Sequence, residues 1–262
     1  MQYLFDTWES LARRFKSADH VLLISDYDGT LTPIVDKPES AILTQEMRKL
    51  IKTLAKNPRY TVGVISGRAL PDLKSKIAID GIIYAGNHGL EIEGFGSSFL
   101  EPLAEEMRPF LSMLNQALSA TLRGIKGVFV ENKGLSLSVH YRMVQGIEEE
   151  KVADTFKKIT DPLHLMGKVR ITRGKKVYEI RPPVDWDKGK AIAWLIARLK
   201  DSRRKGGVLP IYLGDDLTDE DGFKFINKNG GISIFVGGDS FPSVARYFLK
   251  SPEEVKELLK ML

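Results

Sequence analysis

Cysteine is absent from this sequence, which excludes disulfide bonds, thiolate metal sites and a cysteine nucleophile. Long apolar runs are missing as well, because no stretch approaches the roughly 18 residues of a membrane span. The first residues lack the basic-then-apolar layout of a signal peptide, and we find neither low-complexity segments nor obvious repeats. We therefore expect a globular protein located in the cytoplasm, without a membrane partner.

What the sequence contains is typical of an ordinary globular protein. Its 262 residues are 43% hydrophobic and 28% charged, enough for one large domain or two modest ones. The formal net charge of +5 indicates an anionic partner, which could be nucleic acid, a membrane surface or a phosphorylated metabolite.

Apolar runs alternate with helical patterns in two parts of the chain, residues 1–100 and 184–262. Continuous apolar runs between helices are typical of parallel strands that are covered on both faces. The expected strands are 21–25, 61–66, 81–86, 210–215 and 232–238, and the main expected helices are 44–56, 191–199, 220–228 and 251–262. These patterns predict one Rossmann-like, doubly wound α/β unit with a parallel sheet.

The rhythm changes between residues 101 and 183. Helical patterns at 101–118 and 146–159 each precede two strand patterns, which are separated by the turn-like pairs Lys133-Gly134 and Arg173-Gly174. Two strands joined by a short glycine-containing loop are typical of a hairpin. We therefore predict an inserted α+β domain with the order αββαββ.

The first chemical signal is a pair of carboxylates, Asp26 and Asp28, directly after the apolar run 21–25. Carboxylates this close repel each other, and a loop that keeps both ionised usually compensates with a cation such as Mg²⁺. The end of a parallel strand is also where open α/β sheets bind ligands. An ordinary Asx turn with a solvated second acid would explain the pair equally well.

Three further polar clusters occupy equivalent places in the pattern. They are Ser66-Gly67-Arg68, the acidic loop 215–221, and the helix start around Lys188, where a positive helix end could face an anion. Each has a plain alternative: a turn, a capping acid with solvated neighbours, or a surface lysine. Their coincidence at one edge of a parallel sheet favours a site for a metal and a phosphoryl group.

In order and context, Asp26-Tyr27-Asp28-Gly29-Thr30, Ser66, Lys188 and Gly214-Asp215-Asp216 resemble the four motifs of the haloacid-dehalogenase-like (HAD) phosphatases. The segments 85–93, 130–142, 177–192 and 211–224 are similar to trehalose-6-phosphate phosphatases, and the resemblance runs from about residue 20 to the C-terminus. It implies a HAD-like catalytic core, residues 1–100 and 184–262, interrupted by an α/β cap of the C2B type, residues 101–183, that determines substrate specificity.

The resemblance also implies an activity, the Mg²⁺-dependent hydrolysis of trehalose 6-phosphate in trehalose biosynthesis. Asp26 would be the nucleophile and would form an aspartyl-phosphate, and Asp28 would be the general acid and base. The metal would be held by Asp26, Asp215 and the backbone carbonyl of Asp28. The expected phosphate-binding residues are Ser66, Gly67 and Lys188, and the expected supporting residues are Asp216, Asp219 and Thr30.

Substrate selection is expected from the cap. In the strand pattern 135–142 polar residues alternate with apolar ones, which leaves one polar sheet face. The resemblance implies sugar contacts at Glu131, Lys133, Arg142 and Glu179, and Asn87 and His88 are further candidates. A solvated face with cross-strand ion pairs is the alternative, and His140 could equally be a packed histidine.

The charge distribution bears on the partner. Residues 101–183 contain 14 Lys and Arg against 10 Asp and Glu, a net +4 of the total +5. Steering of an anionic sugar phosphate explains this better than nucleic-acid binding, for which no motif is present. We expect a monomer, with a trehalose-6-phosphate synthase as a candidate functional partner. Sucrose-phosphate phosphatase, glycosyl-phosphoglycerate phosphatase, phosphomutase and silent sugar-phosphate-binding regulator are the alternative functions.

Overall fold

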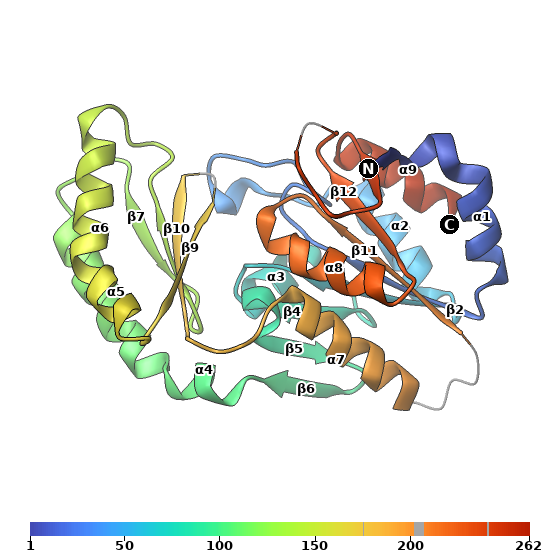
Figure 1. Ribbon diagram of the computed structural model, residues 1–262, viewed down its shortest axis with the longest axis horizontal. Coiled ribbons are helices and arrows are strands. Elements are labelled where there is room, and N and C mark those ends of the chain that lie inside the picture. Colours follow the sequence, from blue (N-terminus) through green and yellow to red (C-terminus); the bar gives the residue numbers. More distant parts are fainter. Residues whose placement is uncertain (175, 202–206, 240) are drawn as a thin grey trace. The chain divides into compact units, whose positions relative to one another are not determined.

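The structure is a computed structural model that describes residues 1–174, 176–201, 207–239 and 241–262. Its contacts divide the chain into two compact units (Figure 1). The larger unit comprises Met1–Phe99 and Trp186–Leu262, and the smaller unit comprises Leu100–Asp185. None of the described helices is both long enough and apolar enough to cross a membrane.

The larger unit is built on a sheet with the strand order β1-β13-β12-β11-β2-β3-β4-β5-β6. Every pair from β1 to β4 in this order is parallel, which confirms the predicted parallel α/β sheet. The strands are β1 (Gln2–Tyr3), β2 (His20–Ser25), β3 (Tyr60–Ile65), β4 (Ile83–Gly86), β5 (Glu91–Gly94), β6 (Ser97–Leu100), β11 (Val208–Gly214), β12 (Ile232–Val236) and β13 (Tyr247–Leu249).

One edge of this sheet differs from the expectation. β5 pairs with β4 in the antiparallel direction, because the chain turns back through the short segment Asn87–Gly89 instead of crossing over by a helix. The sheet is therefore mixed, with an antiparallel edge on an otherwise parallel arrangement.

Helices cover both faces of the sheet. Successive residues of β2 point to opposite faces: Val21 and Leu23 belong to one hydrophobic cluster, and Leu22 and Ile24 to another. The first cluster includes side chains from α1 (Trp8–Ser17), α2 (Gln45–Lys56), α3 (Leu70–Ile77) and α9 (Pro252–Met261), and the second from α7 (Lys188–Asp201) and α8 (Glu220–Lys228). This is the doubly wound arrangement that the alternating pattern predicts.

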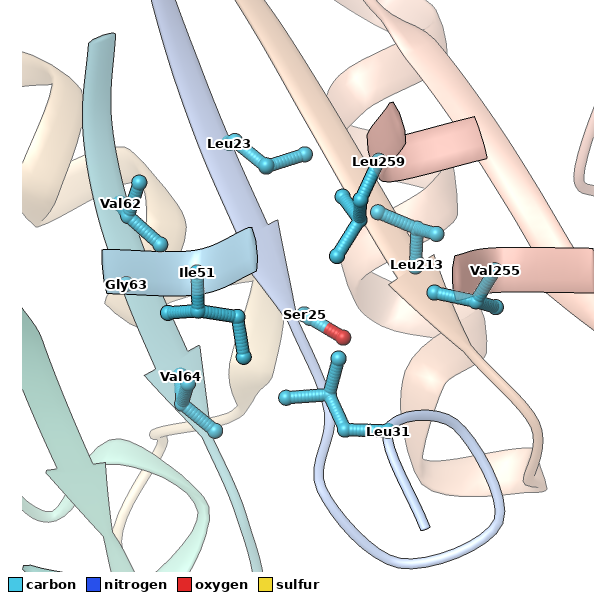
Figure 2. Close-up of a pocket in the computed structure, with 10 residues that line it drawn as sticks. All are labelled: Leu23, Ser25, Leu31, Ile51, Val62, Gly63, Val64, Leu213, Val255 and Leu259. Carbon is cyan, nitrogen blue, oxygen red and sulfur yellow. The ribbon is translucent and has the colours of Figure 1, made fainter. Parts of the chain in front are cut away.

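A small cavity lies inside the first cluster (Figure 2). Nine of its ten lining residues have no polar side-chain atom, and the tenth, Ser25, donates its hydroxyl to the Asp26 carbonyl at 2.7 Å. The polar group is therefore satisfied by the chain itself, and the cavity is a packing gap in the core.

The smaller unit contains a four-stranded antiparallel sheet with the order β7-β8-β10-β9. Its strands are β7 (Phe129–Asn132), β8 (Leu137–His140), β9 (Arg170–Gly174) and β10 (Val177–Arg181), and its helices are α4 (Pro102–Glu106), α5 (Arg108–Leu122) and α6 (Ile147–Leu165). Leu137, Val139 and Ile180 pack with Leu111 of α5 and Phe156 of α6 in one cluster. The helices thus cover the apolar face of this sheet, as the alternating pattern predicts.

Candidate active site

The polar clusters of the larger unit meet at the carboxyl ends of three adjacent strands. β2 lies between β3 and β11, and in this register Ser25 pairs with Val64 on one side and with Leu213 on the other. Asp26, Ser66 and Asp215 follow these strands, so parallel pairing brings them to one edge. The Asp26 amide continues the pairing by donating to the Leu213 carbonyl at 2.8 Å.

Lys188, at the first position of α7, is a buried cation at this edge. Its ammonium donates to Asp26 Oδ1 at 2.8 Å and to Asp219 Oδ1 at 2.6 Å, and its side chain is only 3% exposed. Burial alone would lower the pKa of Lys188, but the attraction of Asp219 and Asp26 outweighs it and raises the pKa. Lys188 therefore stays charged and ties α7 to the strand ends.

Asp219 has no exposed surface and accepts hydrogen bonds from several residues at this edge. Besides Lys188, its carboxylate accepts hydrogen bonds from the Tyr212 hydroxyl and from the amides of Asp215 and Asp216, both at 3.0 Å. Both oxygens of Asp219 are therefore engaged by the protein itself, and its supporting role in the site stays a prediction. Tyr212 was not predicted, although a buried tyrosine in β11 signals a need for a hydroxyl partner.

Asp26 and Asp215 lie close to other carboxylates, and their pKa values are raised. Burial, opposed by Lys188 and reinforced by Asp219, raises the pKa of Asp26 to about 7. Burial, together with repulsion from Asp26 and Asp219, raises the pKa of Asp215 to about 9. Three carboxylates beside one lysine leave a charge imbalance that a divalent cation would relieve.

The same residues suit Mg²⁺ by their chemistry. Asp26, Asp215 and Asp219 each offer a carboxylate oxygen within 4.8 Å of one another, and hard cations prefer oxygen ligands. Since Asp219 is already engaged, Asp26 and Asp215 are the side chains that fit the metal. A Cβ at Gly29 (φ +85°) would collide with the Asp215 carboxylate, so glycine permits the first loop to approach it, and Thr30 Oγ1 lies 3.4 Å from Asp215 Oδ1.

The loop after β3 and the turn after β4 lie against each other. Ser66 is buried, and its hydroxyl accepts a hydrogen bond from the Arg68 amide at 3.2 Å. The His88 amide donates to the Ser66 carbonyl at 2.9 Å, and a Cβ at Gly67 would come within 2.8 Å of the His88 ring. Asn87 is fully buried and donates to Glu91 at 2.7 Å, so Asn87 stabilises the turn after β4.

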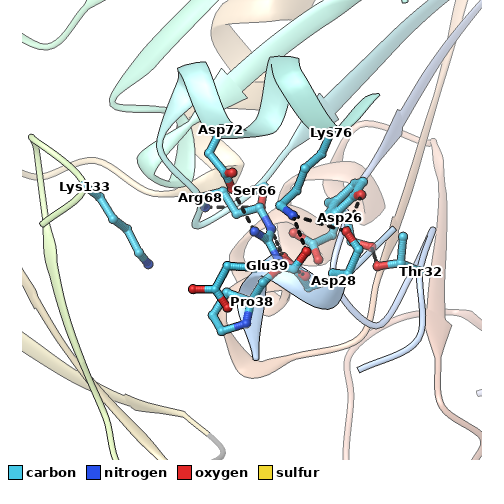
Figure 3. Close-up of polar contacts among 12 residues, drawn as sticks. Asp26, Asp28, Thr32, Pro38, Glu39, Ser66, Arg68, Asp72, Lys76 and Lys133 are labelled. Carbon is cyan, nitrogen blue, oxygen red and sulfur yellow. Dashed lines mark hydrogen bonds and ion pairs between the residues drawn. The ribbon is translucent and has the colours of Figure 1, made fainter. Parts of the chain in front are cut away.

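Asp28 is paired with Arg68, a residue for which no role was predicted from the sequence. The guanidinium of Arg68 donates to both carboxylate oxygens of Asp28, from Nε to Oδ2 and from Nη2 to Oδ1, each at 2.7 Å (Figure 3). Arg68 stands in the predicted Ser66-Gly67-Arg68 cluster, but its side-chain partner, 40 residues earlier in the chain, is visible only in the structure.

Asp216 has a local role in the acidic loop. Its Oδ1 accepts a hydrogen bond from the Leu217 amide at 2.6 Å, and it forms a reciprocal capping box with Asp219 around the turn Leu217–Asp219. Asp216 therefore caps the turn that follows Asp215, and its supporting role in the site stays a prediction.

In the smaller unit the predicted sugar contacts gather on the polar face of the sheet. Glu131, Ser138, Glu179 and Thr172 form one row across the four strands. Glu179 accepts hydrogen bonds from Lys133 and Thr172, each at 3.4 Å. The expected polar face and cross-strand ion pairs are therefore present, but the centre of the face is not solvated, since Ser138 and Glu179 are buried.

His140 and Arg142 lie along and beyond β8. His140 Nε2 is 2.8 Å from Glu131 Oε2, and its ring stacks on Phe129 with a centroid distance of 4.4 Å. His140 is thus packed and at the same time fixes a predicted sugar-binding carboxylate. Arg142 follows the end of β8 and is partly buried.

Comparison of this sequence with known proteins identifies its relatives. The family model described as trehalose-phosphatase matches residues 24–253. The chain is 37% identical over 265 residues to probable trehalose-phosphate phosphatase D of Arabidopsis thaliana, covering 97% of this chain and 70% of that protein. It is 36% identical over 252 residues to trehalose-phosphate phosphatase B of the same plant, covering 92% of this chain and 66% of the relative.

Solved structures show the same fold. The C-terminal domain of trehalose-6-phosphate phosphatase from C. albicans superposes with a TM-score of 0.82 at 24% identity, covering 97% of this chain and 96% of that one. A haloacid dehalogenase-like hydrolase from Bacteroides thetaiotaomicron superposes with a TM-score of 0.62 at 16% identity, covering 92% of this chain and 98% of that one. The predicted HAD-like α/β fold with an additional α+β unit is therefore confirmed.

Proposed function

This chain belongs to the trehalose-phosphatase family, whose members are phosphoric monoester hydrolases, and we propose that it hydrolyses trehalose 6-phosphate to trehalose and phosphate with Mg²⁺ and an aspartyl-phosphate intermediate. The observation that carries the proposal is the strand-end cluster, in which Lys188 holds Asp26 at 2.8 Å beside the buried Asp215. Pure binding of a sugar phosphate does not require such a costly group of buried carboxylates.

In the first half-reaction the Asp26 carboxylate attacks phosphorus in line, a bond forms between its oxygen and phosphorus, and the bond from phosphorus to the sugar oxygen breaks. Asp28 gives its proton to the departing oxygen. In the second half-reaction a water attacks the phosphorus of the aspartyl-phosphate, Asp28 takes the proton of that water, and phosphate leaves while Asp26 is regenerated.

Residues around Asp26 hold the reacting groups. Lys188, the Ser66 hydroxyl and the backbone at Gly67 are positioned to bind phosphoryl oxygens, which is where electrostatic stabilisation acts in phosphoryl transfer. Asp26, Asp215 and the Asp28 carbonyl would hold Mg²⁺, which would supply the positive charge that allows a carboxylate and a phosphate to approach each other.

The smaller unit is proposed to be the cap that selects the substrate. Glu131, Lys133 and Glu179 combine donors and acceptors on one sheet face, and a sugar that left any of these groups unpaired would bind poorly. Arg142 is the fourth proposed contact from this unit, and Asn87 and His88 are proposed contacts from the larger one. Association with a synthase, the monomeric state and the cytoplasmic location stay predictions.

The test is phosphate release from purified protein and Mg²⁺ with a panel of trehalose 6-phosphate, sucrose 6-phosphate, glucose 6-phosphate and mannosyl-3-phosphoglycerate. We expect trehalose 6-phosphate to have the highest kcat/KM, and Asp26→Asn to lower the rate by several orders of magnitude. Asp221→Asn is the matched control, because Asp221 forms an exposed ion pair with Lys224.

Two outcomes would overturn different parts of the proposal. A preference for another panel member would refute the substrate, and full activity of Asp26→Asn would refute the mechanism. The intermediate has its own assay: borohydride reduction of acid-quenched enzyme during turnover should convert residue 26, and no other aspartate, to homoserine.

A further inference from the structure

Arg68 holds the proposed general acid, Asp28, by two parallel hydrogen bonds, which a lysine cannot form in this geometry. Two of its nitrogens donate to the two oxygens of Asp28, each at 2.7 Å (Figure 3). Such a paired contact fixes the plane of the carboxylate as well as its position, whereas a lysine would act as a single point charge. The contact therefore determines the direction in which Asp28 presents its oxygens.

The guanidinium itself is fixed by other parts of the larger unit. Its Nη1 donates to Asp72 at 2.7 Å, its Nη2 donates to the Pro38 carbonyl at 2.8 Å, and it lies over the Tyr27 ring at 5.4 Å. Residues 27–38, which lie about 30 to 40 positions earlier in the chain, and Asp72, one helical turn beyond Arg68, thus converge on one cation.

Burial separates the two partners of the ion pair. The Arg68 side chain is 8% exposed, and that of Asp28 is 39% exposed. Burial alone would lower the pKa of Arg68, but its hydrogen bonds to Asp28 and Asp72 outweigh this and raise the pKa, so the residue is permanently charged. A rigid, buried cation is holding an acid that faces the solvent side of the site.

We propose that Arg68 is a positioning residue of the reaction, which aims Asp28 at the oxygen of the leaving sugar and pairs with both oxygens of the carboxylate that proton donation leaves behind. The inference rests on the proposed function. An exposed aspartate without such a partner samples several rotamers, and catalytic groups need to be held within roughly 0.5 Å of the productive position. The paired contact with Arg68 removes this freedom. Because Asp72 and Pro38 hold the guanidinium in place, Asp28 is also held in a fixed position relative to the larger unit.

This role predicts a dependence on the leaving group. A sugar alkoxide is a poor leaving group and needs the proton of Asp28, whereas the phenolate of p-nitrophenyl phosphate departs without one. A misdirected Asp28 should therefore slow the release of sugar much more than the release of p-nitrophenolate. A general loosening of the site would slow both.

The test compares kcat and KM of Arg68→Lys and Arg68→Gln with those of the wild type on trehalose 6-phosphate and on p-nitrophenyl phosphate, with Mg²⁺ present. For trehalose 6-phosphate we expect kcat to fall about 10- to 100-fold, as for other residues that orient reacting groups, and KM to change less than about threefold. For p-nitrophenyl phosphate we expect kcat to fall less than about threefold. In an Asp28→Asn background the two Arg68 substitutions should have little further effect on sugar release.

Arg48→Lys is the matched control. Arg48 is also partly buried, and it donates to the carbonyls of Ile77 and Lys76 at the end of α3. The same substitution at Arg48 should leave the ratio of the two activities unchanged.

Equal losses on both substrates, an undiminished sugar rate, or a full further loss in the Asp28→Asn background would overturn the proposal. Failure of both Arg68 variants to fold would also overturn it, because Arg68 would then be a structural residue. If the wild type prefers another sugar phosphate, the proposed substrate is wrong, and that sugar phosphate replaces trehalose 6-phosphate in this test.

Discussion

The strand-end cluster of the larger unit and the polar face of the smaller unit are both rich in charge, but they hold it differently. Around Lys188 the ion pairs are 2.6 and 2.8 Å long and their members are at most 8% exposed. On the polar face the Lys133–Glu179 pair is 3.4 Å long with side chains 10% and 11% exposed, and the His140–Glu131 pair is 2.8 Å long with side chains 19% and 31% exposed.

The difference indicates a division of labour. Burial and repulsion between neighbouring carboxylates raise the pKa values of Asp26 and Asp215 against the attraction of Lys188, as is common at catalytic and metal-binding sites. Each pair on the polar face is either longer or more exposed than the pairs at Lys188, and we propose that such pairs exchange partners with the hydroxyl groups of a sugar at lower cost. We therefore assign bond breaking to the first region and substrate selection to the second.

The largest effect that would sharpen this comparison is metal removal. Because Asp26 and Asp215 are crowded without a cation, protein stripped with EDTA should lose at least about 1,000-fold in rate on both trehalose 6-phosphate and p-nitrophenyl phosphate. Mg²⁺ should restore both rates, whereas EDTA neutralised with excess Mg²⁺ beforehand should have no effect. If the rate fell on trehalose 6-phosphate alone, the metal would be needed for substrate selection and not for bond breaking. That result would contradict the comparison.

A smaller effect is expected for Tyr212→Phe. The substitution removes a donor to Asp219 but leaves Lys188 and the backbone amides in place, so both activities should fall together, by less than about tenfold, with about 1 kcal/mol of lost stability. Tyr84→Phe is the control, since the Tyr84 hydroxyl bonds only to Ile79 among the described residues. A selective loss of sugar turnover in Tyr212→Phe would contradict the assigned division.

The pH dependence of stability gives the smallest of these effects. In metal-free protein the pKa values of Asp26 and Asp215 are raised from 3.8 to about 7 and about 9. Between these limits the folded state holds more protons than the unfolded state, so the free energy of unfolding should decrease as pH rises from about 5 to about 9. The measurement is the urea midpoint in EDTA.

In this titration Asp26→Asn should weaken the pH dependence, and Mg²⁺ should offset the loss at high pH. A midpoint that rose steadily over the same range would contradict the assigned burial of these carboxylates.

Apolar runs and their order were sufficient to predict the parallel sheet and the meeting of Asp26, Ser66 and Asp215, because parallel strands that neighbour each other must end at one edge. The alternation in 135–142 likewise placed His140 on the polar face. Its partner Glu131 depends on strand pairing, which a single strand pattern does not contain.

The parts that escaped prediction depend on contacts between distant segments. Nothing near Arg68 in the chain signals Asp28 or Pro38, and nothing near Tyr212 marks Asp219 as the partner of its hydroxyl. The antiparallel edge at β5 follows from the left-handed backbone of Asn87 and His88 (φ 48° and 58°). This conformation is uncommon for residues other than glycine and is hard to predict from a sequence.

The division of labour is tested most directly by one ratio, kcat/KM for trehalose 6-phosphate divided by kcat/KM for p-nitrophenyl phosphate, measured for Ser66→Ala and for Glu179→Gln. Glu149→Gln, on α6, is the matched control in the smaller unit, because Glu149 pairs with Lys176 on its surface. The account predicts that Ser66→Ala lowers both activities and leaves the ratio within about threefold of the wild type, while Glu179→Gln lowers the ratio at least about tenfold. An unchanged ratio in Glu179→Gln, or a collapsed ratio in Ser66→Ala, would contradict it.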